Sequence, residues 1–137
     1  IVDYLTELGE QVDGIGSTRD KIVRAFHQIT LHENTIAEKL LAYLRARPDC
    51  RILGFENGSD ERRVPTISFV VEGQDAGQIA KKIDAYNIAV RFGDFHARRL
   101  LEFLNLTDNG GCVRVSMAHY NTVGEVDALI GALEEVL

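Results

Sequence analysis

Two arginines stand in otherwise apolar runs, and they carry the first chemistry that the sequence offers. Arg91 follows the run Ile88-Ala89-Val90, and Arg114 lies between Val113 and Val115. A guanidinium in such a strand loses hydration free energy unless a carboxylate or another anion meets it. The planar fork of arginine suits a carboxylate held by two hydrogen bonds. We therefore predict an anion site at Arg114 and Arg91; the alternative is that either one leaves a strand end and pairs with a surface glutamate.

The segment Gly93-Asp94-Phe95-His96-Ala97 follows Arg91 directly and leads into a predicted helix. An imidazole at this place could carry a proton or donate a hydrogen bond to an anion, so His96 is a candidate catalytic residue. The simpler interpretation makes His96 a solvent-facing loop residue and Asp94 the cap of the helix.

The remaining histidines offer a second cleft residue but no metal site. His119 follows the strand that carries Arg114 and could line the same cleft, with an ordinary loop histidine as the alternative. His27 and His32 are five residues apart, which puts them on different faces of a helix. No Cys/His spacing of the zinc-site type occurs. We predict no metal ion.

One long helix and a set of shorter elements must position these side chains. Apolar residues recur near a 3.6-residue period from about residue 18 to residue 47, with Ser17 or Thr18 as the cap and Pro48 just past the end. A helix of about 30 residues reaches about 45 Å. Because that exceeds the width of a domain of this size, we expect one end to overhang and to pack on something this chain lacks.

The other elements alternate only partly between strand and helix. We expect a first helix over residues 1–8 that ends at Gly9, strands over 50–54, 64–72, 88–91 and 112–118, and helices over 76–86, 97–106 and 122–137, with residues 55–63 as a solvated turn. Asp75 with Gln78 and Thr122 with Glu125 form capping boxes. This order predicts the α+β class, with a mixed or antiparallel sheet of about four strands, helices on one face and the long helix before it.

Composition limits the function classes. The chain has 137 residues, enough for a single domain over 1–137, and its net charge of −6 disfavours nucleic acid and anionic membranes as partners. No apolar run approaches the roughly 20 residues of a membrane span. The first residues look like the middle of a helix, so we expect a piece cut from a longer polypeptide. Two cysteines form no disulfide framework, which favours the cytoplasm.

Two segments resemble a known family over essentially the whole chain. Arg91-x-Gly93-x-x-His96-Ala97, and then Val113-Arg114-Val115-Ser116-Met117-Ala118-x-Tyr120-Asn121-Thr122-x-x-Glu125-Val126-Asp127-Ala128-Leu129, are similar to the C-terminal small domain of the class V aminotransferases and cysteine desulfurases. The resemblance implies a fold-type I enzyme that depends on pyridoxal 5'-phosphate and acts on an amino acid. It also implies a homodimer, formed mainly through an N-terminal large domain that precedes these residues.

Residue by residue, the resemblance puts Arg114 on the arginine that binds the substrate carboxylate and Arg91 on the arginine of the mobile active-site segment. The chain departs from the family at the loop cysteine that accepts sulfur: His96 stands there, and Asp94 and Phe95 replace two histidines. Imidazole cannot hold sulfane sulfur as a thiolate does. The chain thus resembles a cysteine desulfurase-like branch without the loop cysteine, and its reaction could be transamination, β-elimination, desulfuration or epimerisation.

The cofactor should be held outside these residues. Pyridoxal phosphate needs a lysine, an acidic partner and a phosphate cup, and Lys21, Lys39, Lys81 and Lys82 all fall on predicted polar helix faces. We therefore expect no cofactor-binding residue in this chain and no catalysis by the chain alone. The rival interpretations are a non-catalytic α+β interaction or small-molecule-sensing module, and a small stand-alone enzyme that uses His96 with Asp94.

Overall fold

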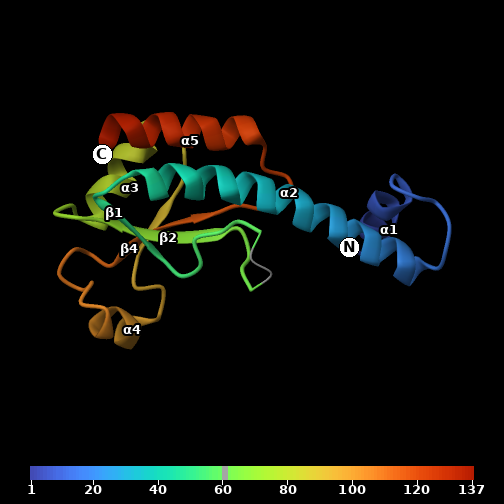
Figure 1. Cartoon of the computed structure of the whole chain (residues 1–137), viewed down its shortest axis with the longest axis horizontal. Helices are drawn as coiled ribbons and strands as arrows, with labels where there is room; N and C mark the ends of the chain where they lie inside the picture. The colour runs from blue at the N-terminus through green and yellow to red at the C-terminus, as the bar shows by residue number, and fades with distance from the viewer. Residues whose placement is uncertain (60–61) are drawn as a thin grey trace.

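The computed structural model describes residues 1–59 and 62–137, so part of the turn predicted over 55–63 lies outside the described residues. Within them the chain forms a four-stranded sheet with helices packed on it (Figure 1). The strands are β1 (Cys50–Leu53), β2 (Thr66–Val71), β3 (Arg91–Gly93) and β4 (Cys112–Ser116), in the spatial order β1-β2-β4-β3. Every pairing is antiparallel. The predicted α+β class is confirmed.

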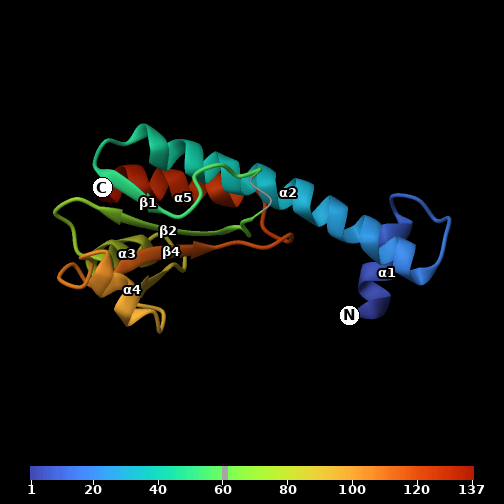
Figure 2. The same ribbon diagram turned by 60° about the horizontal axis from the view of Figure 1, so that its bottom comes forward.

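Three helices cover one face of this sheet and bury the core. They are α2 (Thr18–Ala46), α3 (Ala76–Asp84) and α5 (Val123–Val136). Alternate residues of β2 and β4 point at these helices because side chains of a strand alternate between the two faces. The core joins Phe69 and Val113 of the sheet to Leu40, Ile79 and Leu133 of the helices. The short helix α4 (Arg98–Phe103) lies on the other side of the sheet (Figures 1 and 2).

The long helix begins where the sequence predicts. Ser17 and Asp20 form a capping box, in which the Ser17 hydroxyl accepts a hydrogen bond from the Asp20 amide and the Asp20 carboxylate accepts one from the Ser17 amide. The N-terminal half of α2 extends well beyond the sheet, which confirms the predicted overhang (Figure 2). Helix α1 (Val2–Glu10) of the same chain packs against this half, so the expectation that the overhang packs on something the chain lacks is wrong for this contact. Val23 and Phe26 nevertheless stay exposed on it.

The predicted capping box of Asp75 and Gln78 forms only in half: the Asp75 carboxylate accepts a hydrogen bond from the Gln78 amide at 2.9 Å, without the reciprocal bond. Two further local predictions were wrong. Gly9 does not end the first helix: it lies inside α1, where a Cβ atom would overlap the backbone oxygen of Lys21. Glycine is needed there because the two helix backbones approach too closely for a side chain.

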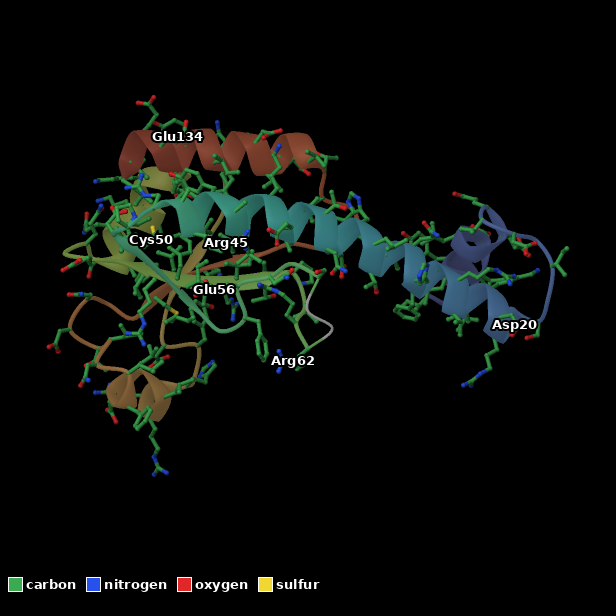
Figure 3. All side chains as sticks on the ribbon, in the orientation of Figure 1. Asp20, Arg45, Cys50, Glu56, Arg62 and Glu134 are labelled. Carbon is green, nitrogen blue, oxygen red and sulfur yellow. The ribbon has the colours of Figure 1, made fainter. Side chains whose placement is uncertain are left out.

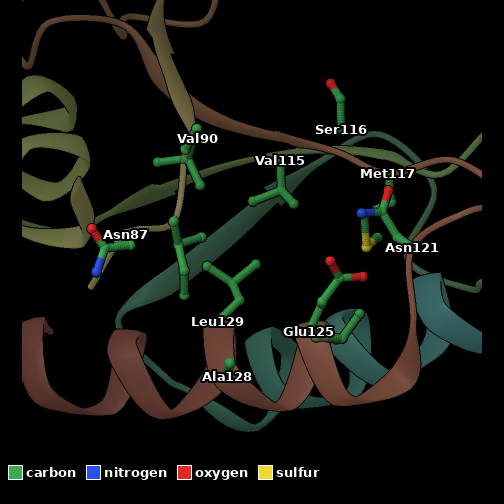
Figure 4. A pocket seen from close by; sticks show the side chains of 12 residues that line it. Asn87, Val90, Val115, Ser116, Met117, Asn121, Glu125, Ala128 and Leu129 are labelled. Atoms are coloured by element: carbon green, nitrogen blue, oxygen red, sulfur yellow. The ribbon is translucent and has the colours of Figure 1, made fainter. Parts of the chain in front are cut away.

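Residues 88–90 are not a strand either, since the pairing with β4 starts only at Arg91. Ile88 and Val90 pack against the core instead, and a cavity of about 280 Å³ lies between this segment, the end of β4 and α5 (Figure 4).

None of the helices in the described ranges combines the length and the apolar character that crossing a bilayer requires.

Candidate functional site

The two arginines singled out by the sequence lie side by side on the outer face of the sheet, the face turned away from α2, α3 and α5. Arg91 of β3 is paired directly with Arg114 of β4, and Ser68 of β2 is the partner of Arg114 on its other side. Val113 and Val115, the neighbours of Arg114 in β4, are buried against the helices. Strand alternation therefore directs Arg114 outward.

A cavity of about 500 Å³, called here the outer cleft, lies over this face. The sheet forms its floor, and the segment after β3 together with α4 forms its wall. Arginine, thiol and hydroxyl groups of the floor meet apolar side chains of the wall. Its lining includes the polar or charged residues Arg51, Ser68, Asp94, Cys112 and Arg114 and the aromatic residue Phe95.

Arg114 has no acidic partner among the residues that the structure describes. Its Nε atom is buried and makes no hydrogen bond there. Its guanidinium carbon lies 3.9 Å from the centre of the Phe95 ring. An unpaired buried polar group costs about 1–3 kcal/mol, and more when it is charged. The pairing with a surface glutamate that we considered from the sequence is therefore absent within the described ranges.

Arg91 is exposed and forms no ion pair with any described residue. The strand register places Arg91 directly opposite Arg114, and like charges in such positions repel. Only Arg114 lines the outer cleft, however, whereas Arg91 lines a separate cavity beside α3. The structure thus pairs the two predicted residues along the strands without placing both in one cleft.

The segment after β3 folds into a tight turn around Asp94. The Asp94 carboxylate accepts a hydrogen bond from the His96 amide at 3.0 Å, and the Asp94 carbonyl accepts one from the Ala97 amide at 2.8 Å. Phe95 and His96 both adopt left-handed backbone angles, with φ of 49° and 63°. Asp94 does not cap α4, because that helix begins after Ala97 and has no side-chain cap. His96 is exposed and is not among the residues that line the outer cleft.

His119 lies apart from the two arginines. Its Nε2 atom is 2.8 Å from the Tyr4 hydroxyl of α1, and it does not line the outer cleft. His32 of α2 contacts the same loop, with Nε2 2.7 Å from the carbonyl oxygen of Asn121. These two contacts anchor the loop after β4 to the helices, and His27 makes neither of them.

The cleft also contains a thiol that we did not place there from the sequence. Cys112 lies two residues before Arg114, so strand alternation puts both side chains on the outer face. Burial raises the pKa of the Cys112 thiol above its ordinary value, although hydrogen bonding to Ser68 and the charge of Arg114 lower it in part. Burial also raises the pKa of the Cys50 thiol. Both groups are therefore protonated at neutral pH and do not replace a loop thiolate.

Phe95 and Arg51 are the other cleft residues that sequence reasoning missed. Arg51 occupies an exposed position of β1. Its charge, between Cys50 and Ile52 in a short strand, could have indicated from the sequence that it points outward. Phe95 carries no comparable signal, because its contact with Arg114 depends on the left-handed turn around Asp94.

Two polar side chains of the cavity beside α5, Glu125 and Asn121, are engaged in local hydrogen bonds (Figure 4). The Glu125 carboxylate accepts a hydrogen bond from the Thr122 amide at 2.6 Å, and the Asn121 side chain accepts one from the Ala118 amide at 2.9 Å. Hydrogen bonds from the Thr122 amide and, to a lesser extent, from the Thr122 hydroxyl hold the pKa of Glu125 below its ordinary value. These groups cap α5 and close the preceding turn, so we assign them a structural role.

The described residues form neither a metal cluster nor a complete cofactor site. No group of three or more metal-ligating side chains gathers within the described ranges. Lys21 is paired with Glu10, Lys39 with Asp127 at 2.7 Å, and neither lines the outer cleft. Lys82 donates to a backbone carbonyl at the end of α5, and Lys81 is exposed on the same helix α3. The residues present therefore do not fit pyridoxal phosphate by themselves.

Comparison with known proteins identifies the family. The family model "Aminotransferase class-V" matches residues 22–129. The aminotransferase-like protein FGM3 of Gibberella zeae is 41% identical over 111 residues, which cover 80% of this chain and 27% of that protein. A probable cysteine desulfurase of Pseudomonas putida is 33% identical over 127 residues, with 92% and 29% covered. The chain belongs to the class V aminotransferase family, whose members depend on pyridoxal phosphate.

Solved structures agree on the fold. The cysteine desulfurase of Thermococcus onnurineus superposes with a TM-score of 0.72 at 24% identity, covering 86% of this chain and 28% of that one. The cysteine desulfurase CsdA of Escherichia coli gives 0.68 at 23% identity, with 89% and 31% covered. The match is to the small domain of these proteins. The matched region spans between a quarter and a third of the length of the Gibberella zeae and Pseudomonas putida relatives.

Proposed function

We propose that this chain is the C-terminal small domain of a longer pyridoxal-phosphate enzyme, and that Arg114 binds the α-carboxylate of its amino-acid substrate. The observation that carries the proposal is the state of Arg114: it lines the outer cleft, its Nε atom is buried, and no described acid neutralises it. A guanidinium in this state has an unfilled place for a carboxylate, which it can bind through two charge-assisted hydrogen bonds.

The remaining parts of the proposal rest on the family. Arg91, opposite Arg114, would contact the same anion once the domain closes over the cofactor pocket. His96 and His119 would act only if their loops move, because neither lines the cleft as it stands. The cofactor, most of the dimer contact and the choice among transamination, β-elimination, desulfuration and epimerisation would belong to the large domain. The two free cysteines suit a reducing compartment such as the cytoplasm.

The test is Arg114→Ala in the full-length enzyme. We expect amino-acid binding, followed through the change in cofactor absorbance on titration, to weaken by roughly 10- to 150-fold, since each charge-assisted hydrogen bond contributes about 1.5–3 kcal/mol. The absorbance of the cofactor itself should not change. Arg19→Ala, an exposed arginine at the far end of α2, is the matched control. Unchanged amino-acid affinity in Arg114→Ala would reject the carboxylate role.

The domain assignment has a separate test. Sequencing the gene upstream of the codon for Ile1 should reveal a large α/β domain with a lysine that follows a histidine. An upstream region without such a domain would contradict the assignment to a pyridoxal-phosphate enzyme.

A further inference from the structure

We propose that Phe95 is a positioning residue for Arg114: its ring fixes the plane of the guanidinium so that the fork faces the outer cleft. This inference rests on the proposed function, because it concerns the same carboxylate site. The starting observation is the contact between the two side chains, with the guanidinium carbon 3.9 Å from the ring centre.

Arg114 needs an external constraint because nothing else holds it. Its neighbours across the sheet are Ser68 and Arg91, and the latter repels it. No described carboxylate lies within ion-pair distance, and the buried Nε atom has no hydrogen-bond partner. A long side chain in such surroundings would sample several rotamers, and only some of them present both terminal nitrogens to one carboxylate.

The ring of Phe95 supplies that constraint in a form that leaves the fork free. A guanidinium stacks on an aromatic face through its π system, so its N–H groups stay in the plane and remain available as donors. An acidic residue in the same place would use the donors that the substrate needs. A neutral ring therefore orients the arginine without competing for its hydrogen bonds.

The turn around Asp94 directs the ring to this place. Its two hydrogen bonds, to the amides of His96 and Ala97, hold the residues between them, and Phe95 lies there with a left-handed φ of 49°. A bulky residue adopts this conformation only when its surroundings impose it. The turn and the ring together make one unit that sets the direction of Arg114.

The experiment is a double-mutant cycle in the full-length enzyme that carries its cofactor, with Phe95→Leu, Arg114→Ala and the combined variant. The probes are the tightest-binding of the twenty standard L-amino acids and the carboxamide of that amino acid, which lacks the carboxylate. Dissociation constants are read from cofactor absorbance. Phe95→Tyr keeps the ring and serves as the conservative variant, and Phe103→Leu removes an aromatic ring that is 81% exposed on α4.

We expect Phe95→Leu to weaken binding of the amino acid by roughly 3- to 30-fold, the range of a cation–π contact, and to leave binding of the carboxamide unchanged. Phe95→Tyr, which keeps the aromatic ring, should bind the amino acid as tightly as the unaltered enzyme. In the Arg114→Ala background, Phe95→Leu should have no further effect, because residues that act through one contact are not additive.

The possible failures separate the inference from the function. If Arg114→Ala leaves amino-acid affinity unchanged, or if no standard amino acid binds, the proposed function fails and this inference with it. If Arg114→Ala weakens binding but Phe95→Leu does not, or affects amino acid and carboxamide equally, or adds fully to Arg114→Ala, only the role of Phe95 is overturned. An equal effect of Phe103→Leu overturns it as well.

Discussion

Charged side chains in this domain differ in how many hydrogen-bond partners the fold gives them. Glu38 has several partners, whereas Arg114 has none among the described residues. The Glu38 carboxylate accepts hydrogen bonds from Arg45 and from the amide of Gly58, the latter at 2.7 Å. Arg45 also donates to the carbonyl oxygen of Glu56, so α2 holds the loop after β1 (Figure 3). Glu38 is thus fully used in the fold, whereas Arg114 keeps donors available for a ligand.

The bonds to Glu38 predict an acid-dependent loss of stability. The hydrogen bond from Arg45, followed by that from Gly58, holds the pKa of Glu38 below its ordinary value of 4.5. A lowered folded-state pKa stabilises the protein above the unfolded value, and this contribution disappears as the pH falls through the folded value. Because the side chain is 43% exposed, we expect Glu38→Gln to reduce the free energy of unfolding by only about 0.5–1 kcal/mol at pH 7.

Urea unfolding at pH 7 and pH 3 measures this difference. The gap between the protein and Glu38→Gln should narrow at pH 3, where the carboxylate is protonated. Glu33→Gln, on the same helix but with no ion pair to a described residue, is the control and should change stability little at either pH. A gap that stays constant from pH 7 to pH 3 would show that the charge of Glu38 does not carry the effect.

At the scale of elements, the local signals predicted the helices well. The boundaries of α2, α3 and α5 follow from period and capping: Ser17 caps α2 and the predicted box Thr122/Glu125 forms. At α3 only half of the predicted Asp75/Gln78 box is present. These signals are local, since a cap needs only residues three apart. The predictions for the start of β3 and for Gly9 were wrong for the opposite reason. Each of these features depends on a contact with another element, β4 for β3 and α2 for Gly9.

The same division holds within the site. The outward direction of Arg114 could be predicted because two valines flank it in an alternating strand. The stacking of Phe95 could not, because it needs the left-handed turn and the register between β3 and β4 together. An acidic partner of Arg114 could come from any part of the chain that folds next to it. Only the structure could therefore exclude such an acid within the described ranges.

The close approach of α1 and α2 at Gly9 leaves no space for a larger residue. Gly9→Ala should destabilise the packing of α1 on α2 by about 1–3 kcal/mol, because the new methyl group would overlap the backbone of Lys21. Gly131→Ala in α5 is the matched control, since no atom beyond the neighbouring residues and backbone of its own helix lies within 4 Å of the position that its methyl group would take, and the φ angle is not left-handed. It should stabilise the protein by about 0.5–1 kcal/mol.

Hydrogen exchange of the α1 amides, together with thermal unfolding, distinguishes the two glycines. Faster exchange confined to α1 is expected for Gly9→Ala and not for Gly131→Ala. Protection of α1 that is the same in Gly9→Ala as in the unaltered protein would contradict the close approach of the two helices.

At the scale of the whole molecule, the sheet separates a packed face from a face built for binding. Helices α2, α3 and α5 cover one side of the sheet, and α4 lies on the other (Figures 1 and 2). This second side carries Arg114 in the outer cleft, with Arg91 opposite it on the neighbouring strand. The relatives are three to four times longer than the matched region. A face with unsatisfied cations and no cofactor group of its own is consistent with a domain that closes over a site formed elsewhere.

This division between the two faces also predicts that the chain alone does not retain the cofactor. The 137-residue chain, incubated with pyridoxal phosphate and then dialysed, should retain no stoichiometric cofactor, because none of its lysines lines the outer cleft and two of them are held in ion pairs with Glu10 and Asp127. The full-length enzyme, treated in parallel, should retain about one cofactor per subunit. Visible absorbance after dialysis measures both. Retention of one equivalent by the short chain, lost on substitution of a single lysine, would place a cofactor site within these residues and contradict the assignment of that site to the large domain.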